Sequence, residues 1–176
     1  MLPEPISLAS TYTVSDMLGI DRGQAQKVAE SGLLGPVYRT DQSVLVERDR
    51  VAELAAWPYL TGPHPAALVV RVAPAKEDEY DDTRRFMGWS AFLDQPVRWE
   101  GVRGWWPCRH PEEVRYLVVV LCGFVVETLK VTGWETGEKD KRKFSVVAAP
   151  RDGRPFMKHR LWTPPGGTTF LLGAEE

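Results

Sequence analysis

The four residues from position 18 to 21 constrain the fold more than any other part of this sequence. Gly19 can adopt the left-handed backbone that ends a helix, and Asp21 is a good N-cap for a second helix directly after it. Apolar side chains with the i, i+3, i+4 spacing of a helix precede this turn: Val14, Met17 and Leu18. We expect the first helix to start at Thr13, with Asp16 as the acid of a capping box. Two short helices joined by a three-residue turn are therefore predicted.

The second helix, predicted at residues 22–31 and closed by Gly32, has one apolar and one polar face. Its small apolar side chains fall together on a helix of 3.6 residues per turn: Ala25, Val28 and Ala29. Its longer polar side chains fall elsewhere: Arg22, Gln24, Gln26 and Lys27. In a helix-turn-helix, the start of the second helix enters the major groove, where arginine pairs with guanine and glutamine with adenine. The polar face is therefore the candidate recognition surface.

A hairpin and a third helix are predicted next. Residues 37–46 have the composition of two short strands around a polar tip, Thr40-Asp41-Gln42-Ser43. Residues 47–50 then open a helix, and Trp57-Pro58 ends it. Its predicted inward positions are Val51, Leu54 and Ala55. The order helix, turn, helix, hairpin, helix is thus complete within fifty residues.

The N-terminal third resembles the winged helix-turn-helix of MerR-type regulators and excisionase-like proteins. The resemblance covers about a quarter of the chain and is carried by Leu18-Gly19-Ile20, by the SGLLG of residues 31–35 and by the charged residues 47–50. It implies DNA binding through the second helix and through the hairpin, which would be the wing. The wing residues expected to contact DNA are Tyr38, Arg39 and Gln42.

The rest of the chain is predicted to be a β-rich domain, which makes the protein α+β. Residues 61–65 contain a glycine and two prolines and are the expected linker between domains at 1–60 and 66–176. A charged run at residues 76–85 is expected to be a solvated helix or loop. Cys122-Gly123 predicts a tight hairpin, and Pro111-Glu112-Glu113 a helical turn. Strands are predicted from composition at residues 67–72, 102–106, 116–121, 124–134, 144–148, 157–162 and 169–172, enough for a barrel or curved sheet.

This second domain faintly resembles the small PUA-like and ASCH-like barrels that handle RNA or modified nucleic acid. The resemblance rests on the GWW of residues 104–106, on residues 111–115 and on the hairpin YLVVVLCGFVVETLKVTGWE. Its tryptophans could stack on bases or line an apolar pocket, although most such residues lie in a core. They are Trp89, Trp99, Trp105, Trp106, Trp134 and Trp162.

Charge is distributed unevenly along the chain. Residues 1–65 hold five Lys/Arg against eight Asp/Glu, whereas residues 139–160 hold eight basic residues against two acidic ones. A cationic segment of this kind can contact DNA phosphates, although a solvated loop is the commoner meaning. Its candidate DNA contacts are Lys141, Arg142, Lys143, Arg151, Arg154, Lys158 and Arg160.

Neither catalysis nor metal binding is predicted. Cys108 and His110 are two residues apart and would point to opposite faces of a strand, and the three histidines are too scattered for a metal motif. We therefore expect no catalytic residue, metal or cofactor, and two reduced structural cysteines. The longest apolar run, residues 117–126, is shorter than the roughly 20 residues that span a bilayer, so no membrane partner and a cytoplasmic location are expected.

The leading hypothesis is a sequence-specific, repressor-like transcriptional regulator of the kind that a phage or mobile element carries. Its expected partner is double-stranded DNA, bound by a homodimer or by a monomer that uses both domains, because so small a module binds weakly alone. The alternative is a protein-docking or antitoxin-like adaptor whose β-domain binds RNA or a small ligand, which the net negative charge of residues 1–65 favours. Salt dependence separates the two, because only DNA binding weakens steeply with salt.

Overall fold

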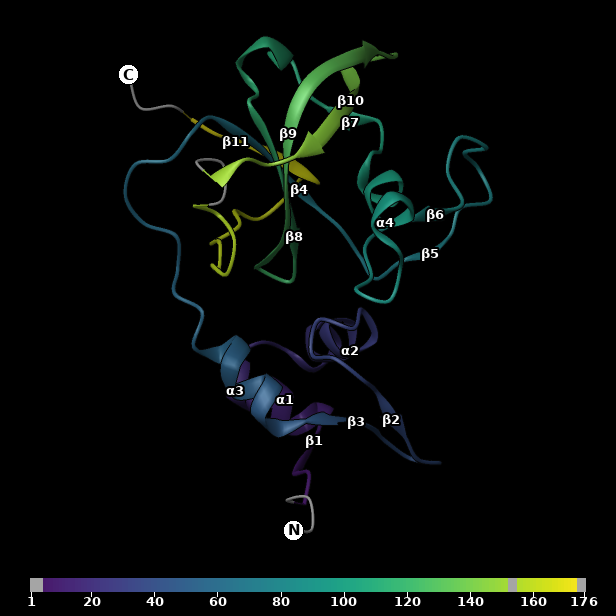
Figure 1. Ribbon diagram of the computed structural model, residues 1–176, viewed down its shortest axis with the longest axis vertical. Coiled ribbons are helices and arrows are strands. Elements are labelled where there is room, and N and C mark those ends of the chain that lie inside the picture. Colours follow the sequence, from purple (N-terminus) through teal and green to yellow (C-terminus); the bar gives the residue numbers. More distant parts are fainter. Residues whose placement is uncertain (1–4, 152–154, 174–176) are drawn as a thin grey trace.

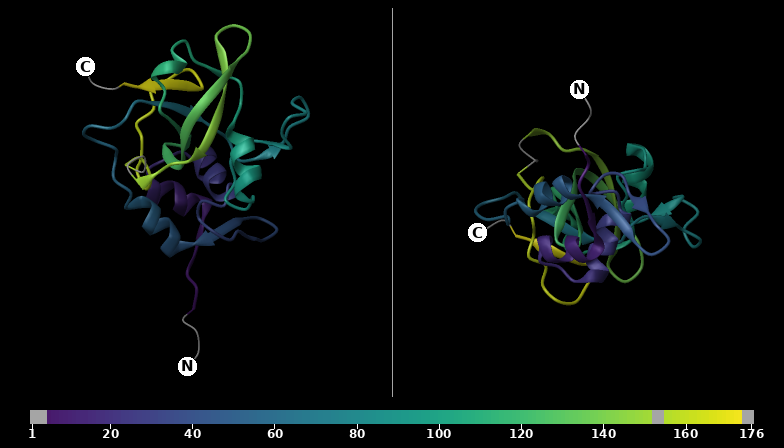
Figure 2. Two further views of the ribbon diagram at one scale, coloured as in Figure 1. Left: turned by 45° about the horizontal axis from the view of Figure 1, so that its top comes forward. Right: turned by 90° about the horizontal axis from the view of Figure 1, so that it is seen from below.

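The computed structural model describes residues 5–151 and 155–173, which form an α+β protein with four α-helices (Figure 1). The first three helices lie together at one end of the molecule, and a six-stranded sheet lies at the other. In the right view of Figure 2, taken from below, the N-terminal helices lie in front of the sheet. Within the described ranges, no helix combines the length and the apolar composition that a bilayer crossing requires.

The N-terminal unit consists of three helices and a small sheet. Its elements are β1 (Leu8–Ser10), α1 (Thr11–Leu18), α2 (Arg22–Glu30), β2 (Tyr38–Arg39), β3 (Val44–Glu47) and α3 (Arg48–Ala55). The strands pair antiparallel in the order β1-β3-β2. Two helices, a hairpin and a third helix therefore occur where the local signals predicted them, and β1 is an addition.

Local capping explains where the first two helices begin and end. The Oγ of Ser10 accepts a hydrogen bond from the Thr13 N–H at 3.3 Å, so Ser10 and not Thr13 caps α1. The prediction of Thr13 was wrong because β1 pairs with β3 and carries the extended backbone up to Ser10. Gly19, with a φ of 64°, ends α1 as expected. The side chains of Asp21 and Gln24 form a capping box at the start of α2, which confirms Asp21 as its N-cap.

The C-terminal unit is a sheet that nearly closes into a barrel. Its strands are β4 (Ala67–Arg71), β7 (Trp106–Pro107), β8 (Tyr116–Leu121), β9 (Phe124–Thr136), β10 (Lys141–Ala148) and β11 (Thr169–Leu172), in the order β11-β4-β8-β9-β10-β7. Strands β4 and β8 are parallel, and the other pairs are antiparallel. The Oγ1 of Thr169 donates a hydrogen bond to the carbonyl oxygen of Pro107 at 3.0 Å, which links the two edge strands. The predicted barrel-like sheet is thus confirmed.

The β8–β9 hairpin forms the centre of this sheet. Every residue of β8 is buried, and the connecting residues Cys122 and Gly123 both have positive φ, at 50° and 87°. A two-residue turn of this type matches the twist of the strands it joins, so the predicted tight hairpin is confirmed. The predicted helical turn is also present, as the 3₁₀ helix η1 (Pro111–Glu113).

Two predicted strands are wrong. The predicted strand at residues 102–106 overlaps the end of α4 (Gln95–Val102), a helix whose start is favoured by a proline in its first turn. Of the predicted strand, only Trp106, in β7, pairs with the sheet. Residues 157–162 form only isolated bridges and no strand, because the backbone groups of Arg160 and Leu161 bond to three residues from two different segments. These partners are Pro58, Leu60 and Gly123.

The charged run at residues 76–85 is neither a helix nor wholly solvated. It starts in β5 (Lys76–Glu77), which pairs antiparallel with β6 (Phe86–Met87). The Nε of Arg84 lies 2.7 Å from Asp78 Oδ2, and these side chains are only 11% and 3% exposed. Inside the loop, Arg84 and Asp78 neutralise each other, so neither buried charge is left unpaired.

The two units are packed against each other. One hydrophobic core contains buried residues of all three N-terminal helices together with residues of β4, β8 and β9. The rings of Trp57 and Phe124 meet edge to face, with centroids 6.2 Å apart. The Ala91 N–H donates to the Ser31 carbonyl at 2.8 Å. A second core, which includes Phe156, lies wholly within the C-terminal unit.

Candidate nucleic-acid interface

A polar hollow lies between α2 and the β2–β3 hairpin. It has a volume of about 320 Å³ and is lined by Thr11, Gln26, Arg39, Thr40, Gln42, Ser43 and Val44. Gln26 comes from α2, whereas Arg39 and Gln42 come from the hairpin, and all three are exposed. The fold therefore brings together three of the expected DNA contacts from two elements. We call this surface the helix–hairpin face.

Arg22 and Tyr38 do not line the hollow, but both are exposed on the two elements that form it, α2 and the hairpin. Arg22 lies one turn before Gln26 and therefore projects from the same side of α2. Its guanidinium carbon lies 5.0 Å from the centre of the exposed Tyr12 ring, which restrains the arginine without consuming its N–H donors. The Tyr38 hydroxyl lies 3.4 Å from Glu47 Oε1, and its ring is exposed.

The side chains of the helix–hairpin face are of types that can form hydrogen bonds to base edges and phosphates. Arginine can donate two hydrogen bonds to guanine, and glutamine can bond adenine through both amide atoms. The Nε2 of Gln26 donates a hydrogen bond to Glu30 Oε1 at 2.8 Å. This hydrogen bond is exposed, so water or a ligand can replace it. The face is thus polar, exposed and built on a helix supported by a core.

Gln24 and Lys27 lie on a different side of α2 from Gln26. Both line a pocket between α2 and the barrel, and the backbone carbonyl of Gln24 accepts a hydrogen bond from Cys122 Sγ at 3.8 Å. The side chain of Gln24 is engaged in the capping box with Asp21. The four polar residues of the predicted recognition helix are therefore divided between two surfaces.

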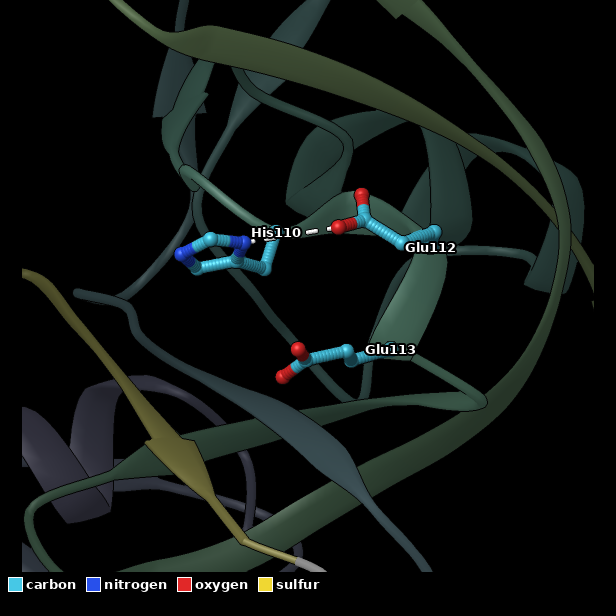
Figure 3. Close-up of side chains that lie close together, drawn as sticks. All are labelled: His110, Glu112 and Glu113. Carbon is cyan, nitrogen blue, oxygen red and sulfur yellow. Dashed lines mark hydrogen bonds and ion pairs between the residues drawn. The ribbon is translucent and has the colours of Figure 1, made fainter.

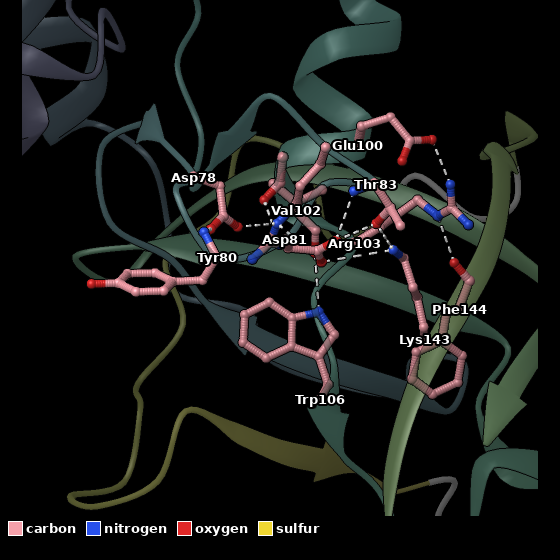
Figure 4. Close-up of polar contacts among 12 residues, drawn as sticks. Asp78, Tyr80, Asp81, Thr83, Glu100, Val102, Arg103, Trp106, Lys143 and Phe144 are labelled. Atoms are coloured by element: carbon pink, nitrogen blue, oxygen red, sulfur yellow. Dashed lines mark hydrogen bonds and ion pairs between the residues drawn. The ribbon is translucent and has the colours of Figure 1, made fainter. Parts of the chain in front are cut away.

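Lys143 is buried, unlike the other basic residues of this segment that the structure describes. Its Nζ lies 2.5 Å from Thr83 Oγ1 and 3.9 Å from Asp81 Oδ2, under the β5–β6 loop (Figure 4). The Thr83 hydroxyl and backbone N–H bond to Asp81 and hold the pKa of that carboxyl below its ordinary value, and Lys143 lowers it further. Lys143 thus anchors a loop and is not free to reach a phosphate.

Arg160 is held at the contact between the two units. Its Nη2 donates to the Leu18 carbonyl oxygen at 3.0 Å, and its guanidinium lies 5.0 Å from the Tyr59 ring centre and 4.8 Å from that of Phe124. Lys141, Arg151 and Lys158 are exposed, Arg142 is half-buried, and Arg154 lies outside the described residues. The basic segment is therefore not one continuous surface.

The tryptophans are divided among different surroundings. Trp89 is buried and its indole N–H donates to Glu127 at 3.3 Å, whereas Trp134 and Trp162 are exposed. Trp105 and Trp106 line an apolar pocket of about 320 Å³ beside Gly104, with Met87 on another wall. The indole of Trp106 donates to the Val102 carbonyl at 3.0 Å (Figure 4).

One set of side chains that the sequence reasoning missed could hold a metal ion. His110, Glu112 and Glu113 offer ligand atoms that all lie within 4.8 Å of one another, and all three are exposed (Figure 3). An imidazole and two carboxylates suit a divalent transition metal. The signal was the H-P-E-E order in the sequence, which a search for clustered histidines does not detect.

Both cysteines have a raised thiol pKa. Burial is the main cause for Cys108, which is buried, and for Cys122, which is half-buried against α2. Desolvation disfavours the thiolate, so both side chains are held as neutral thiols at pH 7.

Comparison of the chain with protein-family models, with curated proteins and with solved structures finds no match.

Proposed function

We propose that this protein is a sequence-specific DNA-binding regulator whose N-terminal unit acts as a winged helix-turn-helix. The observation that carries the proposal is the helix–hairpin face, where Gln26, Arg39 and Gln42 line one polar hollow. A recognition helix with an adjacent hairpin is the arrangement with which such proteins enter the major groove and follow its edge.

Each residue of the face has a role in this proposal. Arg22 and Gln26 lie on one side of α2 and read base edges, because both side chains can make two hydrogen bonds to a base. Arg39, Gln42 and Tyr38 lie on the hairpin and contact the sugar-phosphate backbone, which sets the register of the helix in the groove. The restraint of Arg22 by Tyr12 lowers the entropy lost on binding.

The N-terminal unit alone offers only a small contact area. Single modules of this size bury about 600 to 1,000 Å² on DNA, and specific sites bound tightly need more. We propose that a second copy of the chain supplies the additional contacts. In the basic segment, Lys143 is buried under a loop, and Arg160 does not line the helix–hairpin face.

Selection from a random duplex pool, followed by sequencing at two salt concentrations, tests the proposal. The variant Arg22→Ala with Gln26→Ala removes both base-reading side chains, and Arg48→Ala with Gln95→Ala removes the same residue types from exposed positions off the face. We expect the unaltered protein and the control variant to enrich one motif and the first variant to lose it. If no motif is enriched at both salt concentrations, the proposal is contradicted.

A second candidate function is a protein-docking adaptor. It is favoured by the excess of acidic over basic residues in positions 1–65, which weakens attraction to DNA. In that case the helix–hairpin face contacts a protein, and the pool experiment yields no motif while the protein remains folded.

A further inference from the structure

A second polar pocket lies where the N-terminal unit meets the barrel. We call it the junction pocket. It has a volume of about 410 Å³, and its walls come from α2, the α1–α2 turn, β4, the β8–β9 turn and residues 160–163. This volume falls within the range of small-molecule sites, about 300 to 1,000 Å³, and sites of this kind often lie between structural units.

Three cationic side chains line the junction pocket: Lys27, Arg71 and Arg160. None of the described residues that line it is an aspartate or a glutamate. Lys27 is exposed, so its ammonium group is free to turn toward a ligand. Because several positive charges line one recess without a carboxylate to neutralise them, the pocket favours an anion.

Both arginines are already held in place. The guanidinium of Arg71 donates to the carbonyl oxygens of Pro164 and Gly166, and that of Arg160 donates to Leu18. The Nε of Arg71 is buried and has no hydrogen-bond partner among the described residues. A buried donor without a partner costs free energy, so the groups that hold this guanidinium do not satisfy all of its donors. Prearranged donors also bind oxyanions with little loss of entropy.

Two aromatic rings complete the lining. Tyr59 is 55% exposed and Trp162 is 72% exposed, and both contribute to the wall of the junction pocket. An exposed indole beside cationic groups suits a ligand that has both a planar ring and an anionic group, because the ring can stack while the anion meets the cations.

We propose that the junction pocket binds a small phosphorylated ligand with a planar ring, of the nucleoside monophosphate class. Three positive charges match a phosphate dianion better than a single carboxylate, and the rings supply a stacking surface. Because the walls belong to both units, the bound ligand also bridges them. A ligand that bridges the two units could also control DNA binding, and that control rests on the proposed function. Binding of the ligand itself does not depend on the proposed function.

Titration calorimetry on the full chain without DNA tests this proposal. The probes are AMP, adenosine and inorganic phosphate. We expect AMP to bind at least about tenfold more tightly than adenosine, since one charge-assisted contact exceeds the 1.4 kcal/mol that a factor of ten requires. Lys27→Gln should weaken AMP binding by about tenfold, whereas Lys130→Gln, a matched change at an exposed lysine of β9, should leave it unchanged.

The variant Trp162→Ala separates the ring from the phosphate. It should weaken AMP binding and leave binding of inorganic phosphate unchanged. Equal affinity for AMP and adenosine, or equal AMP binding by the Lys27 variant and its control, overturns the proposal. A DNA duplex is titrated as the other source of phosphate. If only the duplex loses affinity in Lys27→Gln, the cations contact the DNA backbone and the small-ligand proposal is also overturned.

These outcomes are distinct from failure of the proposed function. AMP binding is measured without DNA, and the variants that test DNA reading change Arg22 and Gln26, which do not line the junction pocket. The protein can thus bind the ligand and read no DNA, or the reverse.

Discussion

Arg160 donates a hydrogen bond from its Nη2 to the carbonyl oxygen of Leu18, 142 residues earlier in the chain, at a distance of 3.0 Å. Leu18 is the last residue of α1, where backbone carbonyls have no partner within the helix. A cation at that end also interacts favourably with the helix dipole. One side chain from the barrel unit thus completes a helix of the N-terminal unit.

The first prediction concerns this contact. Arg160→Ala removes the hydrogen bond and the stacking on Tyr59 and Phe124, so we expect it to lower the free energy of unfolding by about 2 to 4 kcal/mol. Urea unfolding followed by circular dichroism measures the change. Arg109→Ala is the control, because the Arg109 side chain is 84% exposed and should matter by less than about 0.5 kcal/mol. Equal effects of the two variants would show that the contact contributes nothing.

The second prediction concerns the close approach of α4 to the loop after β6. A Cβ added to Gly101 would lie 2.7 Å from the carbonyl oxygen of Gly88, which is backbone and cannot rotate away. We expect Gly101→Ala to destabilise the protein by about 1 to 3 kcal/mol, the usual cost of overpacking. Gly133→Ala is the matched control, since no atom lies within 4 Å of its added Cβ. The midpoint of thermal unfolding should fall for the first variant alone.

The third prediction concerns acid stability. Hydrogen bonds from Thr83 lower the pKa of Asp81 below 3.8, and the Tyr80 N–H and Arg84 do the same for Asp78. A carboxyl whose pKa is lower in the folded state stabilises the fold above the unfolded pKa, and this stabilisation is lost as the pH falls through the folded value. The free energy of unfolding should therefore decrease from about pH 5 downward.

Asp81→Asn tests this dependence directly. The variant should be less stable than the unaltered protein at pH 7, and its stability should change less between pH 5 and pH 3, measured by urea unfolding at each pH. Asp82→Asn changes an exposed neighbour and serves as the control. An unaltered pH profile in the Asp81 variant would assign the acid sensitivity to other carboxyls.

The fourth prediction rests on the proposed DNA binding. Arg39 is placed on the hairpin to contact a phosphate, so Arg39→Ala should weaken binding to all sequences alike and lower the slope of log affinity against log salt by about one. Fluorescence anisotropy with the selected duplex and a scrambled duplex, each at several salt concentrations, measures both effects. A loss confined to the selected sequence would instead make Arg39 a base-reading residue.

Short-range signals in the sequence determined the N-terminal unit. Gly19 ends α1 because glycine tolerates the left-handed backbone. Asp21 begins α2 because its side chain accepts a hydrogen bond from a free backbone N–H of the first turn. Cys122-Gly123 likewise determined the central hairpin. Each of these features involves residues a few positions apart, so the local sequence contains all the relevant chemistry.

The surroundings of charged side chains depended on tertiary structure. Lys143 and Arg160 belong to one cationic stretch in the sequence. Lys143 is buried and bonds to Thr83, which lies 60 residues earlier in the chain, whereas Arg160 bonds to the end of α1. Gln24 and Gln26 are equally polar, yet the barrel packs beside only one side of α2.

The sequence by itself therefore determined the three helices of the N-terminal unit, their apolar faces and the central hairpin, but not α4 or the N-cap of α1. Only the tertiary structure decided which polar residues share a surface, how the sheet nearly closes between Thr169 and Pro107, and where the junction pocket lies. The physical reason is that capping and periodicity act within one or two turns, whereas burial and ion pairing depend on segments that fold next to each other from distant positions.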